Sequence, residues 1–70
     1  MTKKELRGYI FKHMEEHGLN YASVGKMMKL TRSAVQSAMT NDSVTYDKLF
    51  SICEHIGLEW VLFVGNDFHN

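Results

Sequence analysis

Residues 20–40 read NYASVGKMMKLTRSAVQSAMT. Apolar residues recur in this stretch at helical spacing, first over 21–28 and again over 32–39. Asn20 and Thr31 stand directly before the two segments, and both residue types favour the N-cap position of a helix. The pattern therefore predicts two short helices joined by a tight break.

The close approach of two such helices determines which of their side chains face inward and which face outward. Lys29-Leu30 forms the break, and Gly25 lies where the helices come nearest, because a residue without a Cβ atom lets the second helix cross the first. We expect the apolar residues here to face inward: Val24, Met27, Met28, Leu30, Val35 and Met39. The outer face of 32–39 is then short or polar and consists of Arg32, Ser33, Gln36 and Ser37.

The chain before this stretch carries the signals of one longer helix. Thr2-Lys3-Lys4-Glu5 matches a capping box, in which a threonine caps the helix and a glutamate three residues later bonds back to it. Apolar residues then follow at helical spacing, namely Leu6, Ile10 and Met14. Gly18 is a stop signal, because glycine adopts the left-handed cap conformation without strain. We expect a helix over about 3–17.

The chain after it predicts a turn and a further helix. Thr40-Asn41-Asp42-Ser43 has the composition of a turn. Thr45 is a good N-cap for a helix from Tyr46 to about Ile56, and Gly57 ends it. The apolar residues of this helix follow the i, i+3, i+4, i+7 pattern of a single buried stripe: Leu49, Ile52, Cys53 and Ile56.

Residues 59–64 read EWVLFV and differ in character from the rest, being rich in aromatic and β-branched side chains. We interpret this segment as a strand, with a short fifth helix as the alternative. A lone strand cannot satisfy its backbone hydrogen bonds, and its simplest partner is the same segment of a second copy. We therefore expect a homodimer, unless the segment packs over the helical core. The expected dimer interface contains Trp60, Val61, Leu62, Phe63 and Val64.

Length and composition predict one small, mainly α domain. The 70 residues are 44% hydrophobic and 23% charged, as in ordinary globular proteins. A chain of this length buries only about 60–65% of its unfolded surface, so dimerisation would supplement a thin core. We expect residues 1–57 to hold four helices, and residues 58–70 to form a short C-terminal strand and tail that serve dimerisation.

Several function classes are disfavoured. Cys53 is the single cysteine, so it has no partner for an internal disulfide. The N-terminal residues are polar rather than signal-peptide-like, and the longest apolar run, 60–64, is too short to span a bilayer. We therefore expect the reducing cytoplasm as the location.

Catalytic and metal-binding chemistry is also disfavoured. His13 and His17 have an i, i+4 spacing that suits zinc, but a third ligand is not evident in the sequence. Cys53 falls on the apolar stripe and is interpreted as a core residue rather than a nucleophile. The sequence shows no phosphate-binding glycine loop and no catalytic pair, so we expect neither an enzyme nor a cofactor or metal.

The charge distribution is uneven although the formal net charge is zero. Residues 1–40 carry seven basic and three acidic side chains, whereas residues 41–70 carry one basic and five acidic. No acidic residue lies between Leu19 and Asn41. One face of a neutral protein can therefore be electropositive, as a nucleic-acid-binding surface requires.

Residues 4–57 resemble the lambda-repressor-like helix-turn-helix family of phage repressors, Cro proteins and many bacterial regulators. The residues that carry the resemblance are LNYASVGKMM at 19–28 and LTRSAVQS at 30–37. The resemblance implies four or five helices, of which the third enters the DNA major groove, and the strand after the helices is similar to the Cro arrangement. Two positions depart from the family pattern: Lys29 replaces a common glycine, and Tyr21 replaces a usual glutamine.

The resemblance implies roles for individual residues. Base contacts are expected from the outer face of 32–39, since arginine grips guanine and glutamine grips adenine with two hydrogen bonds each. These residues are Arg32, Ser33, Gln36 and Ser37. Phosphate contacts, which set the register on the duplex, are expected from Asn20, Tyr21, Lys26, Lys29, Asn41, Thr45 and Lys48.

Two functions of different classes remain open. The first is a sequence-specific regulator of transcription, a phage or bacterial repressor of the Cro kind, which binds double-stranded DNA as a homodimer. The second is a protein-interaction module on the same fold, such as a phage inhibitor or an antitoxin. Zero net charge and the apolar segment around Trp60 and Phe63 favour the second.

Overall fold

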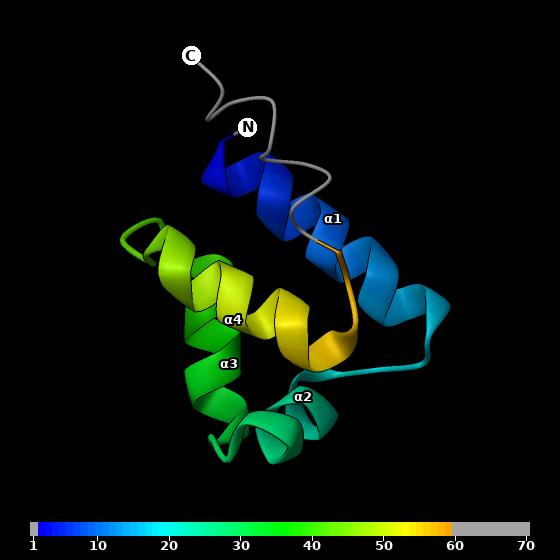
Figure 1. Ribbon diagram of the computed structural model, residues 1–70. Coiled ribbons are helices and arrows are strands. Elements are labelled where there is room, and N and C mark those ends of the chain that lie inside the picture. The colour runs from blue at the N-terminus through cyan, green and yellow to red at the C-terminus, as the bar shows by residue number, and fades with distance from the viewer. Residues whose placement is uncertain (1, 60–70) are drawn as a thin grey trace.

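The computed structural model describes residues 2–59, and these form four α-helices (Figure 1). The helices are α1 (Lys3–Glu16), α2 (Tyr21–Met28), α3 (Arg32–Thr40) and α4 (Tyr46–Ile56). Each agrees with its predicted range to within one residue. The described residues contain no strand. Apart from Glu59, the segment predicted as a strand and dimer interface lies outside the described residues.

All four helices begin at the predicted caps. Each cap side chain accepts a hydrogen bond from the backbone N–H three residues later, which satisfies a group that has no partner within the helix. The caps are Thr2, Asn20, Thr31 and Thr45. The capping box of α1 is present, and α2 has a second one in which the Ser23 hydroxyl accepts from the Asn20 N–H at 2.8 Å.

Helices α1, α2 and α4 end in the same way. A residue with positive φ stands one or two positions after each helix: Gly18, Lys29 and Gly57. The next residue is a leucine whose N–H donates to a carbonyl five residues back, at 2.8–2.9 Å, and whose side chain packs against the core. Lys29 is the only described residue other than glycine with positive φ, at φ 57 and ψ 40. It occupies the position where the resemblance leads one to expect glycine.

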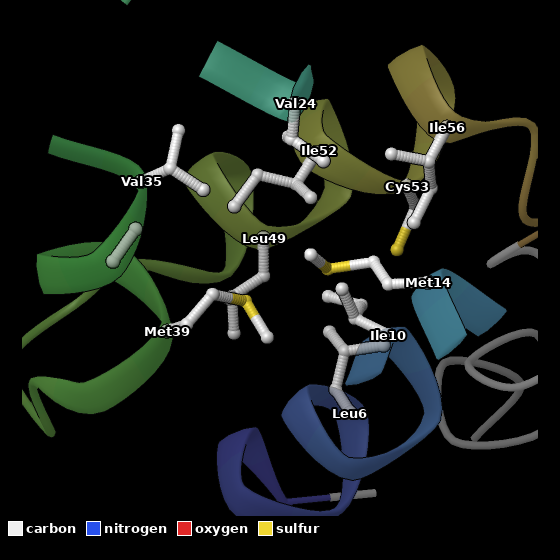
Figure 2. Close-up of a cluster of buried hydrophobic side chains, with 11 residues drawn as sticks. Leu6, Ile10, Met14, Val24, Val35, Met39, Leu49, Ile52, Cys53 and Ile56 are labelled. Carbon is white, nitrogen blue, oxygen red and sulfur yellow. The ribbon is translucent and has the colours of Figure 1, made fainter. Parts of the chain in front are cut away.

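Helix α4 lies between α1 and α3 in the fold (Figure 1). Its predicted stripe is buried, and Figure 2 shows side chains of α1, α2 and α3 pointing toward it. The predicted inward residues of α1 and α3 are buried as well. The core consists of Leu6, Ile10, Met14, Val24, Val35, Ala38, Met39, Leu49, Ile52, Cys53 and Ile56.

The prediction that Met27 faces inward is wrong, because its side chain is 45% exposed. Helix α2 turns its Gly25 side toward the start of α3, and Met27 projects about 160° away from Gly25 around the helix axis. Val24 is buried and Met28 is half-buried, since both lie closer to the Gly25 side.

Gly25 is required by the junction between α2 and α3. A Cβ atom built on Gly25 would lie 2.7 Å from the backbone oxygen of Leu30 and 3.3 Å from backbone atoms of Thr31. The same oxygen belongs to the leucine whose N–H donates to the Gly25 carbonyl at 2.8 Å. The two backbones are therefore in direct contact, and neither can move away without breaking the bond that ends α2.

None of the four helices among residues 2–59 has both the length and the apolar character needed to cross a membrane.

We expect Gly25→Ala to lower the free energy of unfolding by about 1–3 kcal/mol, because the added methyl group meets backbone rather than a movable side chain. The matched control is Gly8→Ala in α1, where a built Cβ meets nothing within 4 Å among the described residues apart from its chain neighbours and the backbone of its own helix. This control should gain about 0.5–1 kcal/mol from better helix propensity. Urea unfolding at low micromolar concentration measures both, and equal effects of the two substitutions would contradict the assigned contact.

Candidate nucleic-acid interface

Helix α3 presents the four predicted base-contacting residues together on its outer face. Arg32, Ser33, Gln36 and Ser37 are all exposed, and the opposite face of the helix is buried in the core. At a rise of about 1.5 Å per residue, this outer face extends for roughly 8 Å along the helix axis. Helix α3 therefore offers one continuous polar stripe.

The predicted phosphate-contacting residues flank α3 on both sides in the sequence. Asn20, Tyr21, Lys26 and Lys29 belong to α2 and its caps, and Asn41, Thr45 and Lys48 belong to the turn after α3 and the start of α4. All are exposed except Tyr21, which is half-buried. The ring of Tyr21 meets Phe11 edge to face at 5.9 Å between centroids, so part of its side chain serves packing.

A shallow depression beside α3 brings three of the predicted residues together. Its volume is about 210 Å³, and its lining includes Ser37, Asn41, Ser43 and Lys48. The Oδ1 atom of Asn41 accepts from the Ser43 N–H at 2.9 Å and from the Ser43 hydroxyl at 2.8 Å. These bonds fix the carboxamide so that its NH₂ group is available to donate. The role of Ser43 was not predicted, although an asparagine two residues before a serine is a common turn signal.

Two of the predicted phosphate contacts also cap helices. The side-chain oxygen of Asn20 accepts from the Ser23 N–H at 2.8 Å, and the Thr45 hydroxyl accepts from the Lys48 N–H at 3.2 Å. Their remaining donors, the Asn20 NH₂ and the Thr45 O–H, are the groups that suit an anionic oxygen. These two residues therefore combine a structural role with a donor group that suits a phosphate.

An ion pair that the sequence pattern does not reveal joins α1 to the turn after α3. Arg7 Nη2 donates to Asp42 Oδ1 at 2.8 Å across 35 positions of sequence. The Arg7 side chain is only 12% exposed, whereas that of Asp42 is 95% exposed. The Nη1 atom of Arg7 is buried and has no hydrogen-bond partner among residues 2–59. Arg7 lowers the pKa of the Asp42 carboxyl, first through this hydrogen bond and then through its charge.

Helices α2 and α3 and the turn between them contain no acidic residue. Lys26, Lys29 and Arg32 are exposed, and none of them forms an ion pair within the described part of the chain. The nearest acidic residue along the chain after α3 is Asp42, whose charge is offset by Arg7. The positive charges of α2 and α3 therefore remain available to an anionic partner.

His13, His17 and Cys53 were considered in the sequence as possible metal ligands or nucleophiles, and their contacts in the structure are as follows. His13 Nε2 lies 3.0 Å from the Ile56 carbonyl oxygen, and the rings of His13 and His17 are 4.2 Å apart between centroids. Within residues 2–59, no three potential metal ligands come together. Burial raises the pKa of the Cys53 thiol to about 11, so the thiol is protonated at neutral pH and is a poor nucleophile.

Comparison of the chain with protein-family models, with curated proteins and with solved structures finds no match. The resemblance of residues 4–57 to the lambda-repressor-like family therefore stays a prediction, and the chain's own geometry has to support any function proposed for it.

We expect Asp42→Asn to lower the midpoint temperature of unfolding at neutral pH, because it leaves a largely buried guanidinium without its counterion. The folded-state pKa of Asp42 is lowered, so this stabilisation is complete above the unfolded pKa of about 4 and is lost as the pH falls through the folded pKa. Thermal unfolding between pH 7 and pH 2 should show the two proteins converging at the acidic end.

Arg7→Met provides the control for this experiment. In that background the carboxylate has no guanidinium to neutralise, so adding Asp42→Asn should change little. A difference between wild type and Asp42→Asn that persists at pH 2 would show that the effect does not come from the ion pair.

Proposed function

We propose that this protein is a sequence-specific regulator of transcription that binds double-stranded DNA, with α2 and α3 as a helix-turn-helix and α3 in the major groove. One observation carries the proposal. Helix α3 exposes Arg32, Ser33, Gln36 and Ser37 on a single face, and neither α2 nor α3 contains an acidic residue. This is the arrangement expected of a helix that reads base edges.

The chemistry of the α3 face suits direct readout. The Arg32 guanidinium is a rigid two-pronged donor that matches O6 and N7 of guanine, and the Gln36 carboxamide matches N6 and N7 of adenine. Ser33 and Ser37 are short, so they leave room for the helix to sit deep in the groove and can bond either base type. The B-DNA major groove is about 12 Å wide and admits one helix of this kind.

Phosphate contacts on both sides of α3 would hold it in register. Lys26 and Lys29 lie on the α2 side, and Asn41 and Lys48 line the depression on the α4 side. Contacts to both edges of the groove fix the orientation of a reading helix without specifying sequence. We further propose that the protein acts as a homodimer in the cytoplasm, with residues 60–64 at the dimer interface, so that two copies of α3 read two half-sites.

A protein-interaction module is the second candidate, and one observation favours it. An apolar depression of about 270 Å³ lies between α1 and α2, lined by Phe11, Met14, Leu19 and Tyr21 among others. Exposed aromatic and aliphatic surface of this kind suits a protein partner. Salt separates the two candidates, because DNA affinity falls steeply with ionic strength and apolar binding does not.

We expect fluorescence anisotropy to show tight binding to DNA from upstream of the protein's own gene, or to duplexes selected from a random pool. A scrambled duplex should bind weakly. Arg32→Lys should lower the affinity for the specific duplex by about tenfold or more, because lysine keeps the charge but cannot make the two-pronged contact. Its affinity for the scrambled duplex and its salt dependence should stay unchanged.

Arg32→Ala should abolish specific binding while circular dichroism shows an intact fold, since the side chain is exposed. Retention of specific affinity by Arg32→Ala would rule out α3 as the reading helix. Failure of the wild type to select any duplex from the random pool would overturn the proposed function and favour the protein-interaction module.

Lys29→Gly tests whether phosphate binding explains the lysine at the left-handed position. We expect the substitution to raise the free energy of unfolding by about 1 kcal/mol, because glycine adopts positive φ without strain. If Lys29 binds one phosphate, the slope of log affinity against log salt should become shallower by about 0.9 in the variant. A gain in stability with an unchanged slope would show that Lys29 does not touch the DNA backbone.

A further inference from the structure

An apolar depression lies between α1 and α2, apart from the exposed face of α3. Its volume is about 270 Å³, and it is lined by Phe11, Met14, Leu19 and Tyr21 together with Glu15 and Asn20. Phe11 is 36% exposed, and its ring meets the Tyr21 ring edge to face at 5.9 Å between centroids. A depression with two contacting rings in its lining suits an apolar occupant, and an aromatic one above all.

The chain itself contains a segment of matching chemistry. Residues 60–64 read WVLFV, which is the longest apolar run of the sequence, and they carry no charge. Two of the five are aromatic, namely Trp60 and Phe63. Aromatic rings favour edge-to-face and offset contacts with other rings, and the depression offers the rings of Phe11 and Tyr21 for such contacts. The depression and the segment are therefore complementary in character.

The chain leaves α4 on the flank of α1 opposite to this depression. His13 Nε2 lies 3.0 Å from the carbonyl oxygen of Ile56, at the end of α4 (Figure 1). Phe11 stands two positions before His13, and at about 100° per residue the two side chains project from opposite flanks of α1. A helix with its side chains is about 10–12 Å wide, so the path around it is roughly 16–19 Å. Residues 60–64 span at most about 18 Å when extended, so a chain would use the whole segment to reach its own depression.

We propose that residues 60–64 of a second copy dock in the depression between α1 and α2, and that each copy of the dimer supplies this segment to the other. The inference rests on the homodimer proposed above, and it names the surface that the segment contacts. The exchange is symmetric, because the same contact between segment and depression forms twice. A single contact thus covers the exposed ring of Phe11 and buries the most apolar run of the sequence.

The size of the contact predicts a reversible dimer. Burial of one aromatic side chain removes about 150–250 Å² of its surface from water, and the lining loses a similar area. Two such contacts per dimer bury roughly 600–1,000 Å², to which the neighbouring residues of the segment add. The total approaches the lower end of the range of about 1,200–2,000 Å² found in stable complexes, so we expect a dissociation constant in the micromolar range.

A charge placed in the depression tests the docking site. Phe11→Lys should weaken dimerisation by about tenfold or more, because the segment would have to cover a lysine in place of a ring. Met27→Lys is the matched control, since Met27 is 45% exposed on α2 but does not line the depression, and it should dimerise as the wild type does. Sedimentation equilibrium of the full chain from micromolar to millimolar concentration measures all three proteins, with circular dichroism to confirm that the variants fold.

Introduced thiols identify which copy supplies the segment, and they decide the question if Phe11→Lys does not fold. A mixture of Phe11→Cys and Phe63→Cys under mild oxidation should give a covalent dimer that neither variant gives alone. A chain that carries both substitutions should be cross-linked between copies rather than within one chain. The native Cys53 is buried and its thiol is protonated at neutral pH, so it reacts slowly in this experiment. Denaturing electrophoresis without reductant separates the products.

The proposal is overturned if the wild type is monomeric throughout the concentration range, or if a folded Phe11→Lys dimerises as the wild type does. It is also overturned if the mixture of thiol variants yields no more covalent dimer than each variant alone. Cross-linking of the double variant only within one chain would show that the segment docks on its own copy. Arg32→Lys should leave self-association unchanged, so failure of DNA binding and failure of the docking can be told apart.

Discussion

The backbone oxygen of Leu30 lies so close to Gly25 that a Cβ atom there would be 2.7 Å from it. This contact, together with the hydrogen bond from the Leu30 N–H to the Gly25 carbonyl, fixes how α3 leaves α2. The crossing of the two helices in turn decides which side of α3 meets Val24 and the α4 stripe. Arg32, Ser33, Gln36 and Ser37 are exposed because the other side of α3 is committed to the core, so the candidate interface depends on a backbone contact in which none of its own side chains takes part.

The local signals of the sequence predicted the helices well, because caps and stops act over three to five residues. Thr2, Asn20, Thr31 and Thr45 cap the helices as expected, and Gly18 and Gly57 end two of them. Met27 was placed wrongly because an eight-residue helix shows too few apolar positions to define its buried side, and the Gly25 contact sets that side instead. The strand predicted for 59–64 lies outside the described residues except for Glu59, so the structure does not test it.

The sequence predicted those features of the candidate site that depend on neighbouring residues and missed one that depends on residues far apart in the chain. The exposure of the α3 stripe follows from helical periodicity, which the sequence displays. The positive φ of Lys29 agrees with the resemblance, in which this residue replaces a common glycine. The Arg7–Asp42 ion pair was missed because its partners are 35 positions apart and Asp42 resembles any polar turn residue. That pair matters to the site, since it joins α1 to the turn that carries Asn41 and Ser43 and offsets a negative charge beside the depression.

At two of the three left-handed helix ends the chain has the glycine that stability favours, and at the third it has a lysine. Gly18 and Gly57 adopt positive φ at no cost, whereas Lys29 adopts it at a cost of about 1 kcal/mol. All three are followed by a leucine that packs on the core, so each position needs a positive φ, which glycine adopts without strain. The lysine stands at the one of these ends that adjoins the N-terminus of α3, in a stretch without acidic residues. A cation with positive φ has no structural benefit there among the described residues, and under the proposed function a contact with the phosphate backbone of bound DNA would offset its cost.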